Sequence, residues 1–150
     1  MQNNMLHKKG FTLVEILLVI GVLAMIVGLG ITVDFSSFNS TTLNGEEAKI
    51  ISLLEKARSR SMSNMFDTTH GFCYDGATDN YVIFKGSTCT TTGSDLIPAS
   101  TLISENSSTT FPATIIFSQL TGNSTTSTIH ITDGTKSKDI TINNAGTINW

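Results

Sequence analysis

The residue with the most conspicuous chemistry in this chain is a glutamate inside an apolar stretch. Residues 11–33 run FTLVEILLVIGVLAMIVGLGITV, and Glu15 is the only charged residue among them. A charge deep in a lipid bilayer costs about 2.5–3.5 kcal/mol on insertion scales, so residues of this kind usually have a function. A carboxylate removed from water also needs a partner, and the apolar stretch offers none. Glu15 is therefore the first candidate for a functional residue.

The stretch that carries Glu15 has the length of a transmembrane helix. Its 23 residues include no proline, and at about 1.5 Å per residue they cover a hydrocarbon core of roughly 30 Å. Residues 1–10 carry Lys8 and Lys9 and no acid, so the positive-inside rule places them in the cytoplasm and residues 34–150 outside. A cleaved signal peptide is disfavoured, because its apolar core has only about 7–15 residues. In a plain anchor, Glu15 would be tolerated because it lies near the cytoplasmic headgroups.

The residues around Glu15 resemble the prepilin peptidase site of type IV pilins and type II secretion pseudopilins. The similar segment leads into the apolar stretch and reads Lys8-Lys9-Gly10-Phe11-Thr12-Leu13-Val14-Glu15. The resemblance implies cleavage after Gly10 by a prepilin peptidase and methylation of the new amino terminus on Phe11. It also implies that Glu15, the fifth residue of the mature chain, pairs with the terminal amine of a neighbouring subunit and sets the axial register of a filament.

The same resemblance implies partners and a location. The partners are other pilin or pseudopilin subunits, the prepilin peptidase, an inner-membrane assembly platform and the membrane. The chain would begin as a single-pass protein of the cytoplasmic (inner) membrane with its C-terminal domain outside. It would then join a filament at the cell surface or in the periplasm, where its role would be structural.

Beyond the apolar stretch, the sequence predicts a polar spacer and a second helix. Residues 34–45 read DFSSFNSTTLNG, and because Ser, Thr and Asn side chains compete for backbone hydrogen bonds, we expect a weak spacer that frays or breaks the helix. Residues 46–65 form an amphipathic helix, with Glu46 and Glu47 at its start, where acids suit the helix dipole. A core-facing stripe recurs at spacings of three and four at Ile50, Leu53, Leu54, Ala57, Ser61 and Met65.

Residues 70–150 predict short antiparallel strands. Two strands at 71–74 and 81–84 flank a turn-rich segment and form a hairpin. Further strands are expected at 114–117, 126–132, 138–142 and 147–150. The expected fold class is α+β, with a long N-terminal transmembrane helix, a second amphipathic helix, and an antiparallel sheet or small β-sandwich as an exported head over residues 46–150.

This order of elements is similar to the GspH-type minor pseudopilins and the related FimT-type minor pilins. The likeness lies in residues 55–84 and 140–150 and is looser than the amino-terminal motif. It implies a minor subunit that acts in assembly, initiation or tip decoration of a type IV pilus or a type II secretion pseudopilus. The Ser/Thr-rich segment 86–110 has no counterpart in the resemblance.

The two cysteines, Cys73 and Cys89, suit a single disulfide in an exported domain. Two free buried thiols are the alternative, because the sequence gives no geometry. No CxxC motif is present, so the pair does not resemble a metal site.

The sequence predicts no catalytic residue, no metal and no cofactor. The three histidines, His7, His70 and His130, lack metal-ligand spacing. His130 and Asp133 suggest a triad, but no nucleophile motif accompanies them. Asp75 and Asp79 lie in a segment that fits turn chemistry better than a calcium loop.

Binding of DNA, a surface or a secreted ligand by the head is the alternative function. The basic residues available are Lys85, Lys136 and Lys138, without arginine or interleaved aromatic residues. The net charge of −3 gives no general argument for nucleic-acid binding. A plain single-pass extracytoplasmic protein is the third reading.

Overall fold

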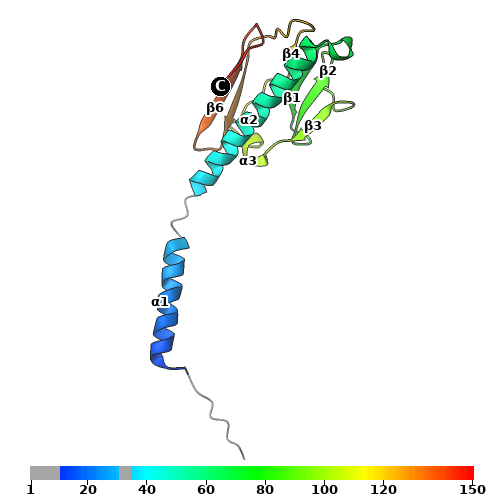
Figure 1. Cartoon of the computed structure of the whole chain (residues 1–150). Coiled ribbons are helices and arrows are strands. Elements are labelled where there is room, and N and C mark those ends of the chain that lie inside the picture. The colour runs from blue at the N-terminus through cyan, green and yellow to red at the C-terminus, as the bar shows by residue number, and fades with distance from the viewer. Residues whose placement is uncertain (1–10, 31–34) are drawn as a thin grey trace, which may run out of the picture. The chain divides into compact units, whose positions relative to one another are not determined.

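The computed structural model describes residues 11–30 and 35–150. The chain divides at residue 35 into two compact units. The first unit holds α1 (Leu13–Gly30), and the second holds α2 (Phe35–Met62) and the β-rich head (Figure 1). The α+β class predicted from the sequence is confirmed.

α1 lies within the expected membrane span of residues 11–33, of which 31–33 fall outside the described residues. It is 18 residues long, and Glu15 lies in its first turn. In the part of the chain that the structure describes, no helix combines the length and apolarity required to cross a bilayer.

α2 differs from the predicted spacer and helix, because it begins at Phe35 and runs for 28 residues. Segment 35–45, expected to fray or break, is helical. The propensity cost of each Ser, Thr or Asn is at most about 0.7 kcal/mol relative to Ala. Burial of Leu43, which is 1% exposed, ties this part of the helix to the core, and tertiary packing of this kind outweighs weak propensity.

The far end of α2 also differs from the expectation. The helix ends at Met62, two residues before Asn64 adopts a left-handed backbone with φ 54°. Asn is one of the few residues that take this conformation at a helix end. A short 3-10 helix, η1 (Met65–Asp67), follows. Met65, predicted as the last residue of the core stripe, therefore lies beyond the helix and is 39% exposed, whereas Ser61 of the same stripe is buried.

The strands form two antiparallel sheets. The first has the order β3-β2-β1-β4 and the second has the order β5-β6-β7. Their bounds are β1 (His70–Asp75), β2 (Asn80–Lys85), β3 (Asp95–Pro98), β4 (Ile115–Phe117), β5 (Ser127–Thr132), β6 (Ser137–Ile142) and β7 (Ile148–Asn149). The predicted hairpin is confirmed as β1 and β2, with Phe72 opposite Ile83. In the Ser/Thr-rich segment 86–110, Leu96 and Ile97 lie in β3, and Leu102 and Ile103 lie in the short α3 (Thr101–Ser104).

One core joins α2 to both sheets, and α2 runs along them in Figure 1. Leu54 of α2, Phe72 of the first sheet and Ile129 of the second belong to one cluster of buried side chains. Ser61 strengthens this junction, because its hydroxyl accepts from the His70 backbone N–H at 2.7 Å and donates to the Phe117 carbonyl at 2.9 Å. The head thus depends on α2 as its central element.

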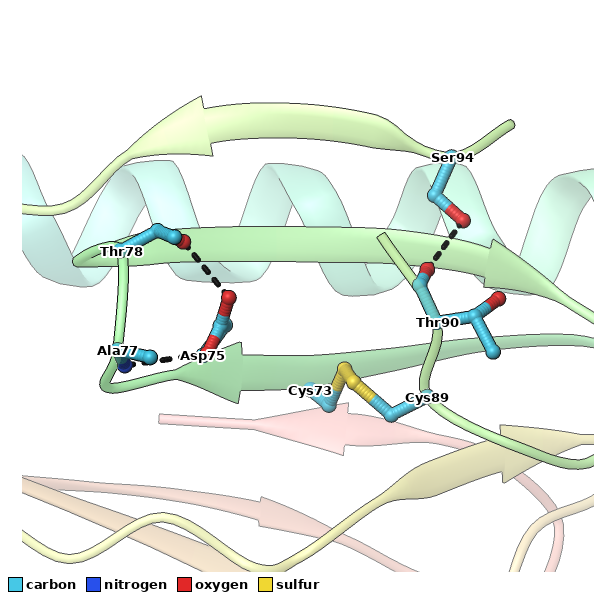
Figure 2. The surroundings of a disulfide bond; sticks show 7 residues. All are labelled: Cys73, Asp75, Ala77, Thr78, Cys89, Thr90 and Ser94. Atoms are coloured by element: carbon cyan, nitrogen blue, oxygen red, sulfur yellow. Dashed lines mark hydrogen bonds between the residues drawn. A yellow bond between two sulfur atoms is a disulfide. The ribbon is translucent and has the colours of Figure 1, made fainter. Parts of the chain in front are cut away.

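The outer face of the first sheet has a small core of its own. Alternate residues of β1 and β2 face away from the main core, and Cys73, Val82 and Phe84 form a second buried cluster there. Cys73 is joined by a disulfide to Cys89, which lies between β2 and β3 (Figure 2). The Cα atoms of the pair are 6.2 Å apart. The disulfide therefore fixes the segment after β2 over this outer face.

Gly71 is required where β1 passes beneath an aromatic ring. A Cβ at this position would lie 2.4 Å from Cζ of Phe84 and 2.6 Å from the carbonyl oxygen of Ile115. Gly45, on the exposed side of α2, has no such neighbour within 4 Å. A side chain at Gly71 would thus clash with its neighbours, whereas a side chain at Gly45 would meet open space.

Replacement of the two cysteines should destabilise the head. The disulfide spans a separation of 16 residues, and closing a loop of this size stabilises by about 2–4 kcal/mol. We expect the double variant Cys73→Ser/Cys89→Ser to lose this amount of unfolding free energy in urea titrations of the full chain in detergent micelles. Reductant should cause the same loss in the unmodified chain and none in the double variant. Equal stability of the oxidised and reduced chains would contradict the structure.

Replacement of each of the two glycines by alanine should change the free energy of unfolding in opposite directions. Gly71→Ala should lower the free energy of unfolding by roughly 1–3 kcal/mol, because the new methyl overpacks the sheet. Gly45→Ala should raise it by up to about 1 kcal/mol, because alanine favours the helix. Urea denaturation measures both. A neutral Gly71→Ala would show that the Phe84 ring is not held over β1.

Candidate functional site

The first turn of α1 is built by a threonine cap. Thr12 precedes the helix, and its hydroxyl oxygen accepts from the Glu15 backbone N–H at 3.2 Å. The Thr12 carbonyl accepts from the N–H groups of Glu15 and Ile16 at 3.1 and 3.2 Å. Thr12 is thus the N-cap and Glu15 the third helical residue, the positions of a capping box. A carboxylate there also gains about 0.3–1 kcal/mol from the helix dipole.

Thr12 is a functional candidate that the sequence analysis did not single out. The signal was present, since Thr-x-x-Glu before an apolar run is the pattern of a helix start. The cap fixes where the helix begins and therefore where Glu15 projects. Its effect is to hold the carboxylate one turn from the backbone of Phe11.

α1 offers apolar surface on all sides. Apart from Glu15 it contains no charged residue, and its side chains are solvent-exposed through residue 28. Phe11, just before the helix, is 81% exposed. A helix that is apolar all round is stable where lipid or other helices cover it. The chemistry of this segment is therefore association, with one carboxylate at its start.

The remaining amino-terminal candidates, Lys8, Lys9 and Gly10, lie outside the described residues. Their proposed role in recognition and cleavage remains a prediction. Phe11 and Glu15 are described, and Glu15 comes four positions after Phe11 along the chain.

Glu46 and Glu47 are not at a helix start, because α2 begins at Phe35. Both are buried, with exposed fractions of 3% and 7%. Glu46 accepts from the Ser100 backbone N–H at 2.8 Å and forms an ion pair with Lys49 at 2.7 Å. Lys49 is three residues further along the same helix, but Ser100 is 54 positions away in sequence, so hydrophobic periodicity could not reveal that contact.

The three lysines considered for DNA binding do not lie on one sheet. Lys85 ends β2 of the first sheet, and its ammonium lies 5.6 Å from the centroid of the Phe66 ring. Lys138 lies on β6 of the second sheet and pairs with the buried Glu47 at 3.1 Å. Lys136 lies in the turn before β6. Lys138 thus contributes to the contact between α2 and β6 through its ion pair with Glu47.

The other chemical candidates have structural partners. Nδ1 of His130 on β5 is hydrogen-bonded to the carboxylate of Asp139 on β6. The Asp75 carboxylate accepts from the Ala77 N–H at 3.1 Å and from the Thr78 hydroxyl at 2.7 Å, which is turn chemistry (Figure 2). Within the described residues, no group of three or more histidine, cysteine or acidic side chains is placed to hold a metal ion.

Two protein families match the chain. The family described as type II transport protein GspH matches residues 48–146, about two thirds of the chain, from within α2 to the turn before β7. The prokaryotic N-terminal methylation motif matches residues 5–31, which include the cap and Glu15. No curated protein and no solved structure gives a significant match.

The two matches cover the two compact units separately. The methylation motif covers the segment with the lone carboxylate, and the other match covers most of the head that surrounds α2. The chain therefore belongs to the family of type II transport protein GspH and carries the amino-terminal methylation motif of prokaryotic pilins.

Proposed function

We propose that the chain is a minor pilin or pseudopilin, cut after Gly10, methylated on Phe11 and inserted into a filament through its apolar helix. The observation that carries the proposal is the position of Glu15. It lies in the first, threonine-capped turn of an apolar helix, just after the proposed cleavage point. The match to the methylation motif supports the same reading.

The pairing of Glu15 follows from the charges that cleavage creates. A new amine on Phe11 would lie at the positive end of the helix dipole, where a cation is disfavoured and a carboxylate is favoured. Both charges would be buried when apolar helices pack together, so each needs a partner. In a bundle of like subunits, the amine of one chain pairs with the Glu15 carboxylate of the next, so each buried charge has a partner. Loss of one partner would leave a buried charge that costs about 3–5 kcal/mol.

The route to the filament begins in the membrane. Segment 11–33 holds the unassembled subunit in the inner membrane, with residues 1–10 on the cytoplasmic side, where the prepilin peptidase acts. The head lies on the other side, where the Cys73–Cys89 disulfide is compatible with an oxidising compartment. The subunit then passes to the filament through an inner-membrane assembly platform. Its role there is assembly, initiation or tip decoration.

The cleavage proposal predicts the mass of the mature chain. In cells that produce the peptidase, the intact protein should lack residues 1–10 and carry one additional methyl group. Gly10→Ala should keep the leader and stay in the membrane fraction. Gly21→Ala, the same change at a glycine of α1 with nothing within 4 Å of its Cβ position, is the matched control and should be processed normally. An uncut, unmethylated wild-type chain would refute the proposal.

The charge-pairing proposal predicts that Glu15→Gln separates processing from assembly. The variant should be cut and methylated, but its incorporation into filaments should fall by on the order of 100-fold, because the amine loses its buried partner. Glu55→Gln, at an exposed position of α2, should assemble normally. Quantitative immunoblots of sheared or purified filaments measure both. Normal assembly of Glu15→Gln would favour a plain membrane anchor.

A further inference from the structure

A small pocket lies in the head where the end of α2, η1 and the β1–β2 hairpin meet. Its volume is about 200 Å³, and its walls include Arg60, Phe66, His70, Lys85 and Asp95. The proposed assembly role uses none of these side chains. The pocket therefore requires an explanation of its own.

His70 gives the first indication of a ligand. Its side chain lies in the wall of the pocket and the residue is only 2% exposed, yet its Nδ1 has no hydrogen-bond partner. Buried polar atoms are nearly always paired, because an unpaired one loses its hydration without compensation. A ligand group that enters the pocket would supply the missing partner.

The charges around the pocket favour an anion. Asp95 is already held by Lys56 at 2.9 Å and by Arg60 at 2.7 Å, and these two cations keep the pKa of its carboxyl below the usual value. Lys85 has no carboxylate within ion-pair distance among the described residues. Three cations therefore face one carboxylate, which leaves an excess of positive charge at this corner of the head.

The rim of the pocket is apolar. Phe66 is 68% exposed, and its ring lies beside the Lys85 ammonium. Its backbone is left-handed, with φ 62°, a conformation that costs a non-glycine residue roughly 1–2 kcal/mol. The turn thus keeps a large aromatic side chain in water, next to a cation, at an energetic cost. Strained residues of this kind cluster at binding sites.

We propose that this pocket binds a carboxylate carried beside an apolar group. Lys85 and Arg60 face the carboxylate, Nδ1 of His70 donates a hydrogen bond to it when the ring is protonated, and Phe66 covers the apolar part. A carboxylate fits better than a phosphate, because Asp95 in the wall opposes a second negative charge and Phe66 leaves an apolar rim. The carboxylate can come from a free small molecule or from an acidic side chain of another polypeptide.

Binding should be coupled to a proton. In the free chain, burial is the main cause that lowers the pKa of His70, and the positive charges of Arg60 and Lys85 lower it further. An anion in the pocket offsets both cations and therefore raises the pKa of His70. Because the bound form has the higher pKa, binding takes up a proton, and affinity falls as pH rises through that pKa.

The test is a titration of the full chain in detergent micelles with benzoate, followed by the imidazole nitrogen resonances of His70. Assignment comes from the spectrum of the double variant His7→Gln/His130→Gln, in which His70 is the only histidine left in the chain. We expect saturable shifts, a rise in the pKa of His70 at saturation, and weaker binding at higher pH. Benzamide, which has the same ring without the charge, should give no saturable shift, and inorganic phosphate should bind more weakly than benzoate.

A matched pair of variants tests the geometry. Lys85→Gln should weaken benzoate binding roughly three- to tenfold, as expected for one exposed charge contact. Lys136→Gln removes the same charge from the turn before β6 in the other sheet and should leave the affinity unchanged. The proposal is wrong if benzoate does not saturate, if both variants respond equally, or if phosphate binds at least as tightly.

A second ligand identifies the source of the carboxylate. The capped peptide acetyl-leucyl-glutamyl-leucinamide presents an acidic side chain between two apolar ones. Tighter binding of this peptide than of benzoate supports the pocket and assigns it to a polypeptide. Tighter binding of benzoate supports the pocket and assigns it to a free small carboxylate.

Discussion

The head of this protein depends on one helix whose inner face packs against both sheets. Leu54 and Ala57 of α2 are fully buried, and the main core draws its members from α2 and from both sheets. The sheets are small, with four and three strands, and each needs a covering layer to bury its inner face. α2 supplies that layer for both. Ser61 adds directional bonds at the end of the same stripe, where its hydroxyl joins β1 to β4.

This dependence explains which predictions from the sequence were right. The spacing of Ile50, Leu54 and Ala57 predicted a core-facing helix, because apolar periodicity reports the buried face directly. The β1–β2 hairpin could be predicted equally well, because two strand-like segments flank a turn rich in Asp, Gly and Asn. Both features are local, so neither required knowledge of the rest of the fold.

The sequence could not reveal features that depend on distant contacts. Ser, Thr and Asn made 34–45 look like a spacer, but burial of Leu43 extends α2 to Phe35. Glu47 looked like a helix-start residue, yet it pairs with Lys138, which lies more than ninety residues further along. The pocket beside His70 likewise joins residues of five separate elements. At the amino terminus the opposite holds, because the cap and Glu15 belong to one turn and could be predicted from four consecutive residues.

The two compact units suit separate tasks. α1 presents apolar side chains and one carboxylate, which any subunit with the same motif could match. The head holds the pocket, which lies at the far end of α2. At about 1.5 Å per residue, the 28 residues of α2 span roughly 40 Å between the pocket and the point where the apolar segment joins the head. A ligand in that pocket would therefore not compete with contacts at the start of α2. The proposed association through α1 and the proposed recognition in the pocket therefore use different residues.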